Sequence, residues 1–186
     1  MDNSEALNKF LAGVERRAFR MSEIATGNRE DALDLVQDAM FKLVDKYSNR
    51  GPDDWGPLFY RILQSRIRDW RRRNTVRRRV MGFLQSARDG DDPAATVERY
   101  PDAEGRQPEM QTHTGQLMAR LEPALHALPL RQQQVFLLRL WEGLDVKQTA
   151  RAMGCSEGSV KTHYWRALRA LRARLEGATG VLDEPK

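Results

Sequence analysis

The chain has 186 residues, of which 40% are hydrophobic and 31% charged, and its formal net charge is +5. That length allows one or two small domains, and the excess of Lys and Arg favours a polyanionic partner. The sequence has no apolar run of the ~20 residues needed to cross a bilayer, no signal peptide, and a single cysteine, Cys155, so that no intramolecular disulfide can form. We therefore predict a cytoplasmic protein that does not insert into membranes.

The residue pattern favours a binding protein over an enzyme. His113, His126 and His163 lie far apart in the sequence, and none has a second ligand type at metal-binding spacing. No phosphate-binding loop, nucleotide-binding glycine pattern or nucleophile elbow is present in the sequence. The expectation is a protein without catalytic residues, metal, cofactor or small-molecule substrate.

Helical periodicity covers residues 5–79 and returns over residues 116–175. Between these stretches, Ser86–Met110 contains three prolines, two glycines and an excess of acidic residues, which is the composition of a linker. The sequence therefore predicts an all-α fold with two small helical domains joined by a flexible acidic linker. The predicted boundaries are a first domain at 1–80, the linker at 81–115, a second domain at 116–177 and a tail at 178–186.

The stretch Arg29–Tyr47 predicts an amphipathic helix with an unusual polar face. Its expected buried stripe is Leu33, Val36, Met40, Leu43, Val44 and Tyr47. The opposite face is acidic and carries an outward aromatic side chain, with Asp34, Gln37, Asp38, Phe41 and Asp45. Two readings are equally compatible with this face: a docking patch for a basic partner surface, anchored by Phe41, or an ordinary solvated face with a half-buried Phe41.

The stretch Asp53–Arg79 predicts a second amphipathic helix that is rich in arginine. Its expected apolar side consists of Trp55, Phe59, Ile62, Leu63 and Trp70, and Arg66 lies towards that side. Its expected opposite side consists of Arg61, Gln64, Arg68, Arg71 and Arg72. Arginines at this density hold phosphates, and the interleaved aromatic residues, including Tyr60, can either pack in a core or stack on unpaired bases. A calmodulin-binding or membrane-surface helix is the competing use of such a segment.

The sequence from Leu121 to Leu175 predicts a helix-turn-helix. A helix is expected over Leu130–Glu142, with Val135, Phe136, Leu138 and Leu140 buried and Gly143 at its end. Asp145 and Gln148 form a capping box for a short helix over Val146–Met153, Gly154 supplies the left-handed turn, and Ser156 caps a third helix. The expected buried stripe of that third helix is Val160, Tyr164, Leu168, Leu171 and Leu175.

The start of the third helix presents short polar and basic side chains that can reach base edges and phosphates in a major groove. These are Ser159, Lys161, Thr162, His163 and Arg166, together with Glu157. The alternative is a plain three-helix bundle with a solvated basic face.

Taken in chain order, the stretches "DLVQDAMFKL", "FYRILQSRIRDWRRR" and "LPLRQQQVFLLRLWEGLDVKQTARAMGCSEGSVKTHYWRALRALRARL" resemble an extracytoplasmic-function (ECF) sigma factor of the sigma-70 superfamily. The resemblance covers nearly the whole chain outside the linker. It implies sigma region 2 followed by region 4, without catalytic activity. It also implies binding to core RNA polymerase, promoter-specific initiation of transcription and, commonly, control by an anti-sigma factor.

The resemblance also implies roles for the residues named above. It places Asp34, Gln37, Asp38, Phe41 and Asp45 on the clamp helices of the polymerase β′ subunit, and the helix around Arg131–Arg139 near the β flap. It assigns melting and capture of the −10 element to Trp55, Tyr60, Arg61, Gln64, Arg68, Arg71 and Arg72. It assigns reading of the −35 element to Ser159, Lys161, Thr162, His163 and Arg166, although His163 stands where family members often carry arginine.

Two further functions use parts of the same sequence. A stand-alone helix-turn-helix regulator would need the C-terminal motif but not the face around Asp34 and Phe41. A protein that binds RNA or anionic membrane surfaces would need only the basic helix.

Overall fold

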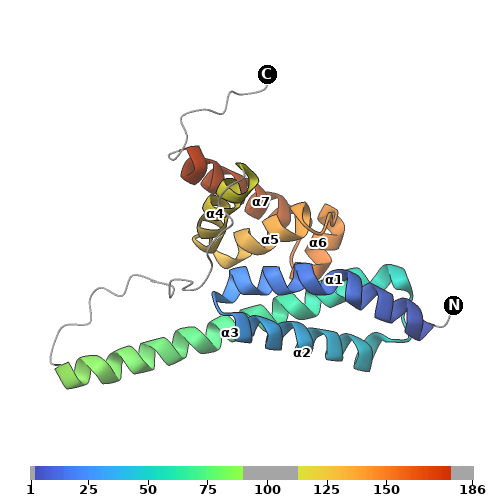
Figure 1. The fold of residues 1–186 in the computed structure, drawn as a ribbon, viewed down its shortest axis with the longest axis horizontal. Helices are drawn as coiled ribbons and strands as arrows, with labels where there is room; N and C mark the ends of the chain where they lie inside the picture. Colours follow the sequence, from blue (N-terminus) through green and yellow to red (C-terminus); the bar gives the residue numbers. More distant parts are fainter. Residues whose placement is uncertain (1–2, 90–112, 177–186) are drawn as a thin grey trace.

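A computed structural model of the chain describes residues 3–89 and 113–176, and within these ranges all the regular elements are α-helices. The N-terminal unit is α1 (Asn3–Thr26), α2 (Arg29–Tyr47) and α3 (Pro52–Asp89). The C-terminal unit is α4 (His113–His126), α5 (Leu130–Leu140), α6 (Val146–Met153) and α7 (Glu157–Glu176). Figure 1 shows the two units as two layers. The predicted all-α fold with two helical domains is confirmed.

The N-terminal unit is a three-helix bundle with an aromatic core. Gly27 has a φ of 68° and ends α1, and the side chain of Asn28 accepts a hydrogen bond from the Asp31 N–H and so caps α2. Inside the bundle, Phe10 of α1 contacts Trp55 and Phe59 of α3, with ring centroids 5.9 and 6.2 Å apart. These contacts fix α1 against α3 and leave one side of α2 outermost.

The buried face of α2 differs from the predicted stripe. Val36 and Leu43 are buried as expected, but Leu33 and Val44 are each 42% exposed. The stripe is centred instead on Leu35 and the small residues Ala32 and Ala39, which are buried. The reason is that α2 packs against both α1 and α3, so the side facing the two partners, with alanines that allow close approach, becomes the core.

Helix α3 is 38 residues long and continues to Asp89, past the predicted end of the first domain at residue 80. Its C-terminal half projects beyond the other helices (Figure 1). The predicted linker at 81–115 therefore begins and ends in helix, and its central residues 90–112 lie outside the described residues, as does the tail at 178–186. The placement of Gln64 on the exposed side of α3 was wrong, because its side chain is fully buried.

The predicted helix-turn-helix is present as α6 and α7. Asp145 accepts a hydrogen bond from the Gln148 N–H, at 2.7 Å, and the Gln148 side chain accepts one from the Asp145 N–H, at 2.9 Å. Gly154 takes the left-handed conformation with a φ of 60°, and the Ser156 hydroxyl accepts a hydrogen bond from the Ser159 N–H. The predicted capping box, turn glycine and cap are thus confirmed.

Two leucines expected in the C-terminal core lie at the surface. Leu140 is 53% exposed and Leu168 is 42% exposed, whereas Ala167 and Leu171 are buried. Leu140 is the last residue of α5, which ends two residues earlier than predicted. Helix α7 packs against α5, α6 and α4, and Ala167 is fully buried, with a small side chain that allows close approach of a neighbouring helix. Leu168, one position on, points away from the core.

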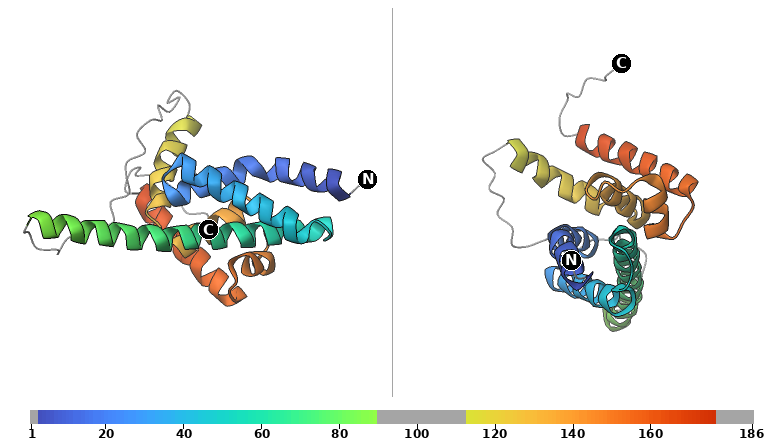
Figure 2. Two further views of the ribbon diagram at one scale, coloured as in Figure 1. Left: turned by 90° about the horizontal axis from the view of Figure 1, so that it is seen from below. Right: turned by 90° about the vertical axis from the view of Figure 1, so that its right-hand side faces the viewer.

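The two units pack against each other. Helix α6 lies against α3, and α4 and α5 contact α1, so that one apolar cluster is continuous across both units. The end-on view of Figure 2 shows α4–α7 on one side of the α1–α3 bundle. This packing decides which of the predicted functional side chains reach the surface.

The turn glycine gives the first testable prediction. Gly154→Ala is expected to destabilise the protein by about 1–2 kcal/mol, because a Cβ disfavours the left-handed conformation although there is room for it. Gly13→Ala is the matched control: Gly13 is exposed within α1, also with room for a methyl group, and alanine there is expected to stabilise by about 0.5–1 kcal/mol. Thermal unfolding by circular dichroism should give shifts of opposite sign, and two shifts of the same sign would contradict the prediction.

Candidate functional site

The predicted acidic face of α2 is at the surface over its whole length. Asp34, Gln37 and Asp45 are exposed, Phe41 is 73% exposed, and the Asp38 side chain is 61% exposed. An apolar ring this exposed, flanked by carboxylates, has the composition of an interaction surface. The burial of Leu35, Val36 and Ala39 on the opposite side of α2 holds these side chains outward.

The predicted DNA-contacting residues of α3 divide between three environments. Arg61 is exposed, and the Arg72 side chain is 79% exposed with its guanidinium 3.7 Å from the Asp69 carboxylate. Arg68 and Arg71 are half-buried and donate hydrogen bonds to the carbonyl oxygens of Met153 and Ala25. Only Arg61 and Arg72 are thus fully accessible in this arrangement.

Trp55, Tyr60 and Gln64 form the third group, and all three are buried. The Trp55 indole N–H donates to the Tyr47 carbonyl, and the Gln64 amide donates to the thioether sulfur of Met21. The Trp55 ring belongs to the core of the N-terminal unit, whereas Tyr60 lies at the contact with the C-terminal unit.

Two arginines of α1 form ion pairs with the C-terminal unit. The Arg17 Nε lies 3.2 Å from both carboxylate oxygens of Glu142, and Arg20 contacts Glu122. The Glu142 side chain is only 3% exposed, while that of Arg17 is 52% exposed. Burial, together with the neighbouring Glu142 carboxylate, raises the pKa of the Tyr60 hydroxyl, so this ring lies at the pair as a neutral group.

A second polar contact joins α3 to the helix-turn-helix. The Met153 carbonyl, at the end of α6, accepts hydrogen bonds from Arg68 at 3.1 Å and from Arg131 at 2.9 Å. Burial, followed by the charge of Arg131, lowers the pKa of Arg68. The contact therefore brings two like charges together at the C-terminal end of α6, where the helix dipole favours cations.

The start of α7 presents the predicted −35 readers to differing degrees. Lys161, Thr162 and Arg166 are exposed, whereas Ser159 and His163 are half-buried. Burial and the charges of Arg131 and Arg166 lower the pKa of His163, so that its imidazole is neutral near pH 7. A neutral imidazole can donate or accept a hydrogen bond but does not neutralise a phosphate.

The structure adds one residue that the sequence analysis did not single out. Trp165 on α7 is 59% exposed, and the Arg169 guanidinium lies 5.5 Å from the centre of its ring. Its position one residue after Tyr164, off the expected apolar stripe, was the available signal. An exposed indole beside Lys161 and Arg166 can make apolar contact with bases or sugars.

His126 lies where α4 meets the N-terminal unit, and its titration makes the stability of the folded protein depend on pH. Burial lowers its pKa from the ordinary value of 6.5, and the charges of Arg71 and Arg20 act in the same direction, against Glu122 and Glu23. Protons are therefore bound less readily in the folded state than in the unfolded state, so stability is lost as pH falls below about 6.5.

The expected result is a lower Tm at about pH 5.5 than at about pH 7.5, measured in one buffer series. The His126→Gln variant should show a smaller difference between these two conditions, because the depressed titration has been removed. An equal pH dependence in both proteins would exclude His126 as its source.

The described residues contain neither a metal-binding cluster nor a membrane-spanning helix. Across residues 3–89 and 113–176, no group of three or more His, Cys, Asp and Glu side chains could hold a metal ion. In those ranges no helix is both long and apolar enough to span a membrane.

The fold and its surfaces define a two-unit helical protein with a helix-turn-helix at its C-terminal end. Residues 7–89 match the family model for sigma-70 region 2, and residues 118–171 match the model for sigma-70 region 4. The chain therefore belongs to the sigma-70 family of RNA polymerase sigma factors, within its ECF group.

Individual relatives agree with this family assignment. RNA polymerase sigma factor SigV of Bacillus subtilis is 27% identical over 162 residues, covering 84% of this chain and 83% of SigV. ECF sigma factor SigE of Mycolicibacterium smegmatis is 27% identical over 157 residues, covering 84% of this chain and 56% of SigE. The solved structure of sigma factor RpoE from Bartonella quintana, in complex with the anti-sigma factor NepR, shares the fold with a TM-score of 0.56 at 23% identity, covering 91% of this chain and 96% of RpoE.

Proposed function

We propose that the chain acts as an ECF sigma factor in the bacterial cytoplasm, where it binds core RNA polymerase and directs initiation at specific promoters. It acts by binding alone and catalyses no reaction. The observation that carries this proposal is the match of both units, in order, to sigma-70 regions 2 and 4.

The exposed surfaces of the two units fit different binding partners. The acidic face of α2, with Phe41, is available for the β′ clamp helices of polymerase, and the start of α7 is available for the −35 major groove. Arg61 and Arg72 on α3 are available for phosphates near the −10 element, and the helix around Arg131 is the expected contact for the β flap.

Full engagement of the −10 element requires a change in the arrangement of the units. Tyr60 and Gln64 are buried, and Arg68 is bonded to the C-terminal unit. Bases can reach Tyr60 and Arg68 only after the C-terminal unit has moved away from α3, whereas Gln64 is held within the N-terminal unit by its hydrogen bond to Met21. An anti-sigma factor is the further partner that we propose, and the fold shared with RpoE, solved with its anti-sigma factor NepR, is compatible with one.

The test is to incubate the purified chain with bacterial core polymerase and then map transcription from fragmented genomic DNA. A sigma factor should co-purify with polymerase and produce discrete start sites that share two upstream motifs. Tight, salt-sensitive binding to duplex DNA without binding to polymerase would instead indicate a stand-alone helix-turn-helix regulator.

A further inference from the structure

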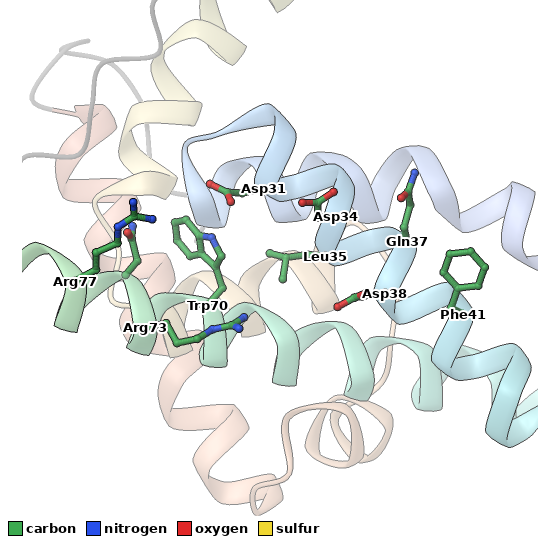
Figure 3. A pocket seen from close by; sticks show the side chains of 10 residues that line it. Asp31, Asp34, Leu35, Gln37, Asp38, Phe41, Trp70, Arg73 and Arg77 are labelled. Atoms are coloured by element: carbon green, nitrogen blue, oxygen red, sulfur yellow. The ribbon is translucent and has the colours of Figure 1, made fainter.

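A groove runs between α2 and α3 on the side of the N-terminal unit that carries the acidic face. It has a volume of about 520 Å³. One wall is Asp34, Asp38 and Phe41 of α2, and the other is Trp70, Arg73 and Arg77 of α3. Figure 3 shows Trp70 pointing from α3 towards α2, with Arg77 near one end of the groove and Phe41 at the other.

The two walls carry opposite charges that do not neutralise each other. Among the described residues, one ion pair links α2 to α3 beside this groove: it joins Asp38 to Arg66 at 3.9 Å, a distance too long for a strong hydrogen bond. Asp34, Arg73 and Arg77 make no ion pair with any described residue. The groove therefore offers a row of carboxylates and a row of guanidinium groups with a space between them.

This charge arrangement favours a protein over a nucleic acid as the occupant of the groove. A phosphate that entered the groove to reach Arg73 would also face the carboxylates of Asp34 and Asp38, which line the same groove and would repel it. Phosphates are thus disfavoured at Arg73 and Arg77.

We propose that Arg73 and Arg77 belong to the polymerase-docking surface rather than to the DNA-binding surface, and that the groove receives a helix of the polymerase. The complementary helix carries basic side chains over the α2 wall, acidic side chains over the α3 wall and an apolar side chain between Phe41 and Trp70. This inference rests on the proposed function, because it extends the α2 docking face across the groove to α3.

The experiment compares variants with equal changes of charge on two faces of α3. Arg73→Glu with Arg77→Glu reverses the groove wall, and Arg61→Glu with Arg72→Glu reverses two exposed arginines outside it. Asp38→Arg with Phe41→Ala tests the α2 wall. Each protein is first shown by circular dichroism to be folded, and its Kd for core polymerase is then measured without DNA.

The groove-wall variant is expected to bind polymerase at least about tenfold more weakly, while the Arg61 and Arg72 variant binds like the wild type. Wild-type affinity of the groove-wall variant, with loss of binding by the α2 variant, would overturn this inference and leave the proposed function standing. Absence of polymerase binding by the wild-type chain would instead remove the proposed function. A concentration-dependent dimer of the wild type that the groove-wall change abolishes would also overturn the inference, because it would identify a second copy as the occupant.

Discussion

Replacing Arg17 with glutamate is expected to separate the two units and to expose Tyr60 and Arg68. Glu142 is almost fully buried, and the Arg17 guanidinium is the cation that contacts both of its oxygens. The substitution would place a second carboxylate beside a buried one and so leave Glu142 without its counter-ion.

Loss of one partner from a buried ion pair costs about 3–5 kcal/mol, and the half-exposed position of Arg17 reduces the expected cost to about 2 kcal/mol. This cost falls only on the closed arrangement, in which the two units pack together, because both carboxylates are hydrated once the units separate. A difference of about 2 kcal/mol changes the ratio of open to closed molecules roughly 30-fold. The other contacts between the units are unchanged by the substitution: Arg20 with Glu122, Arg68 with the Met153 carbonyl, and the shared apolar cluster.

Small-angle X-ray scattering should report a larger radius of gyration for Arg17→Glu, and hydrogen exchange should report faster exchange in α6, which packs on α3. Arg16→Glu makes the same change of charge at the adjacent exposed position and should leave both readouts unchanged. Glu142→Gln, which removes the charge but keeps the shape, should give an intermediate result. A folded Arg17→Glu protein with the wild-type radius of gyration would mean that the pair does not hold the units together.

The contrast between local and long-range contacts explains what the sequence could predict. Asp145, Gly154 and Ser156 act on backbone groups within a few residues, so their roles follow from spacing alone. The Arg17–Glu142 pair joins residues that are 125 positions apart. No periodicity or composition indicates that contact, and for the same reason the burial of Tyr60 by the C-terminal unit could not be predicted.

The errors in the predicted core have a related origin. Helical periodicity identifies the apolar side of a helix to within about one residue, but the partner helix decides which of two adjacent positions it covers. Leu33 and Leu168 were therefore placed in the core, although the adjacent Ala32 and Ala167 are the buried residues. The exposed face of α2 was predicted correctly because its charged residues span a wide arc that no rotation of this size could bury.

Lys161→Ala combined with Arg166→Ala is expected to weaken binding of the polymerase complex to its −35 element about a hundredfold. Each side chain is exposed at the start of α7, so the double change removes DNA contacts without opening a cavity in the core. A good base contact is worth about 1–3 kcal/mol, and a lost phosphate contact weakens binding to all sequences alike. A contact to a base can be distinguished from a contact to a phosphate, because only phosphate contacts release counterions.

The measurement is the salt dependence of binding to a mapped promoter and to the same duplex with an altered −35 element. If both side chains contact phosphates, the slope of log K against log[salt] should fall by about 2 and both duplexes should lose affinity equally. If either reads a base, the mapped promoter should lose more. Arg172→Ala, further along the same helix and also exposed, is the control for general loss of positive charge. Because the pKa of His163 is lowered and its imidazole is neutral near pH 7, the slope of the wild type should steepen only below pH 6.5. A slope that steepens near neutrality would contradict the lowered pKa of His163.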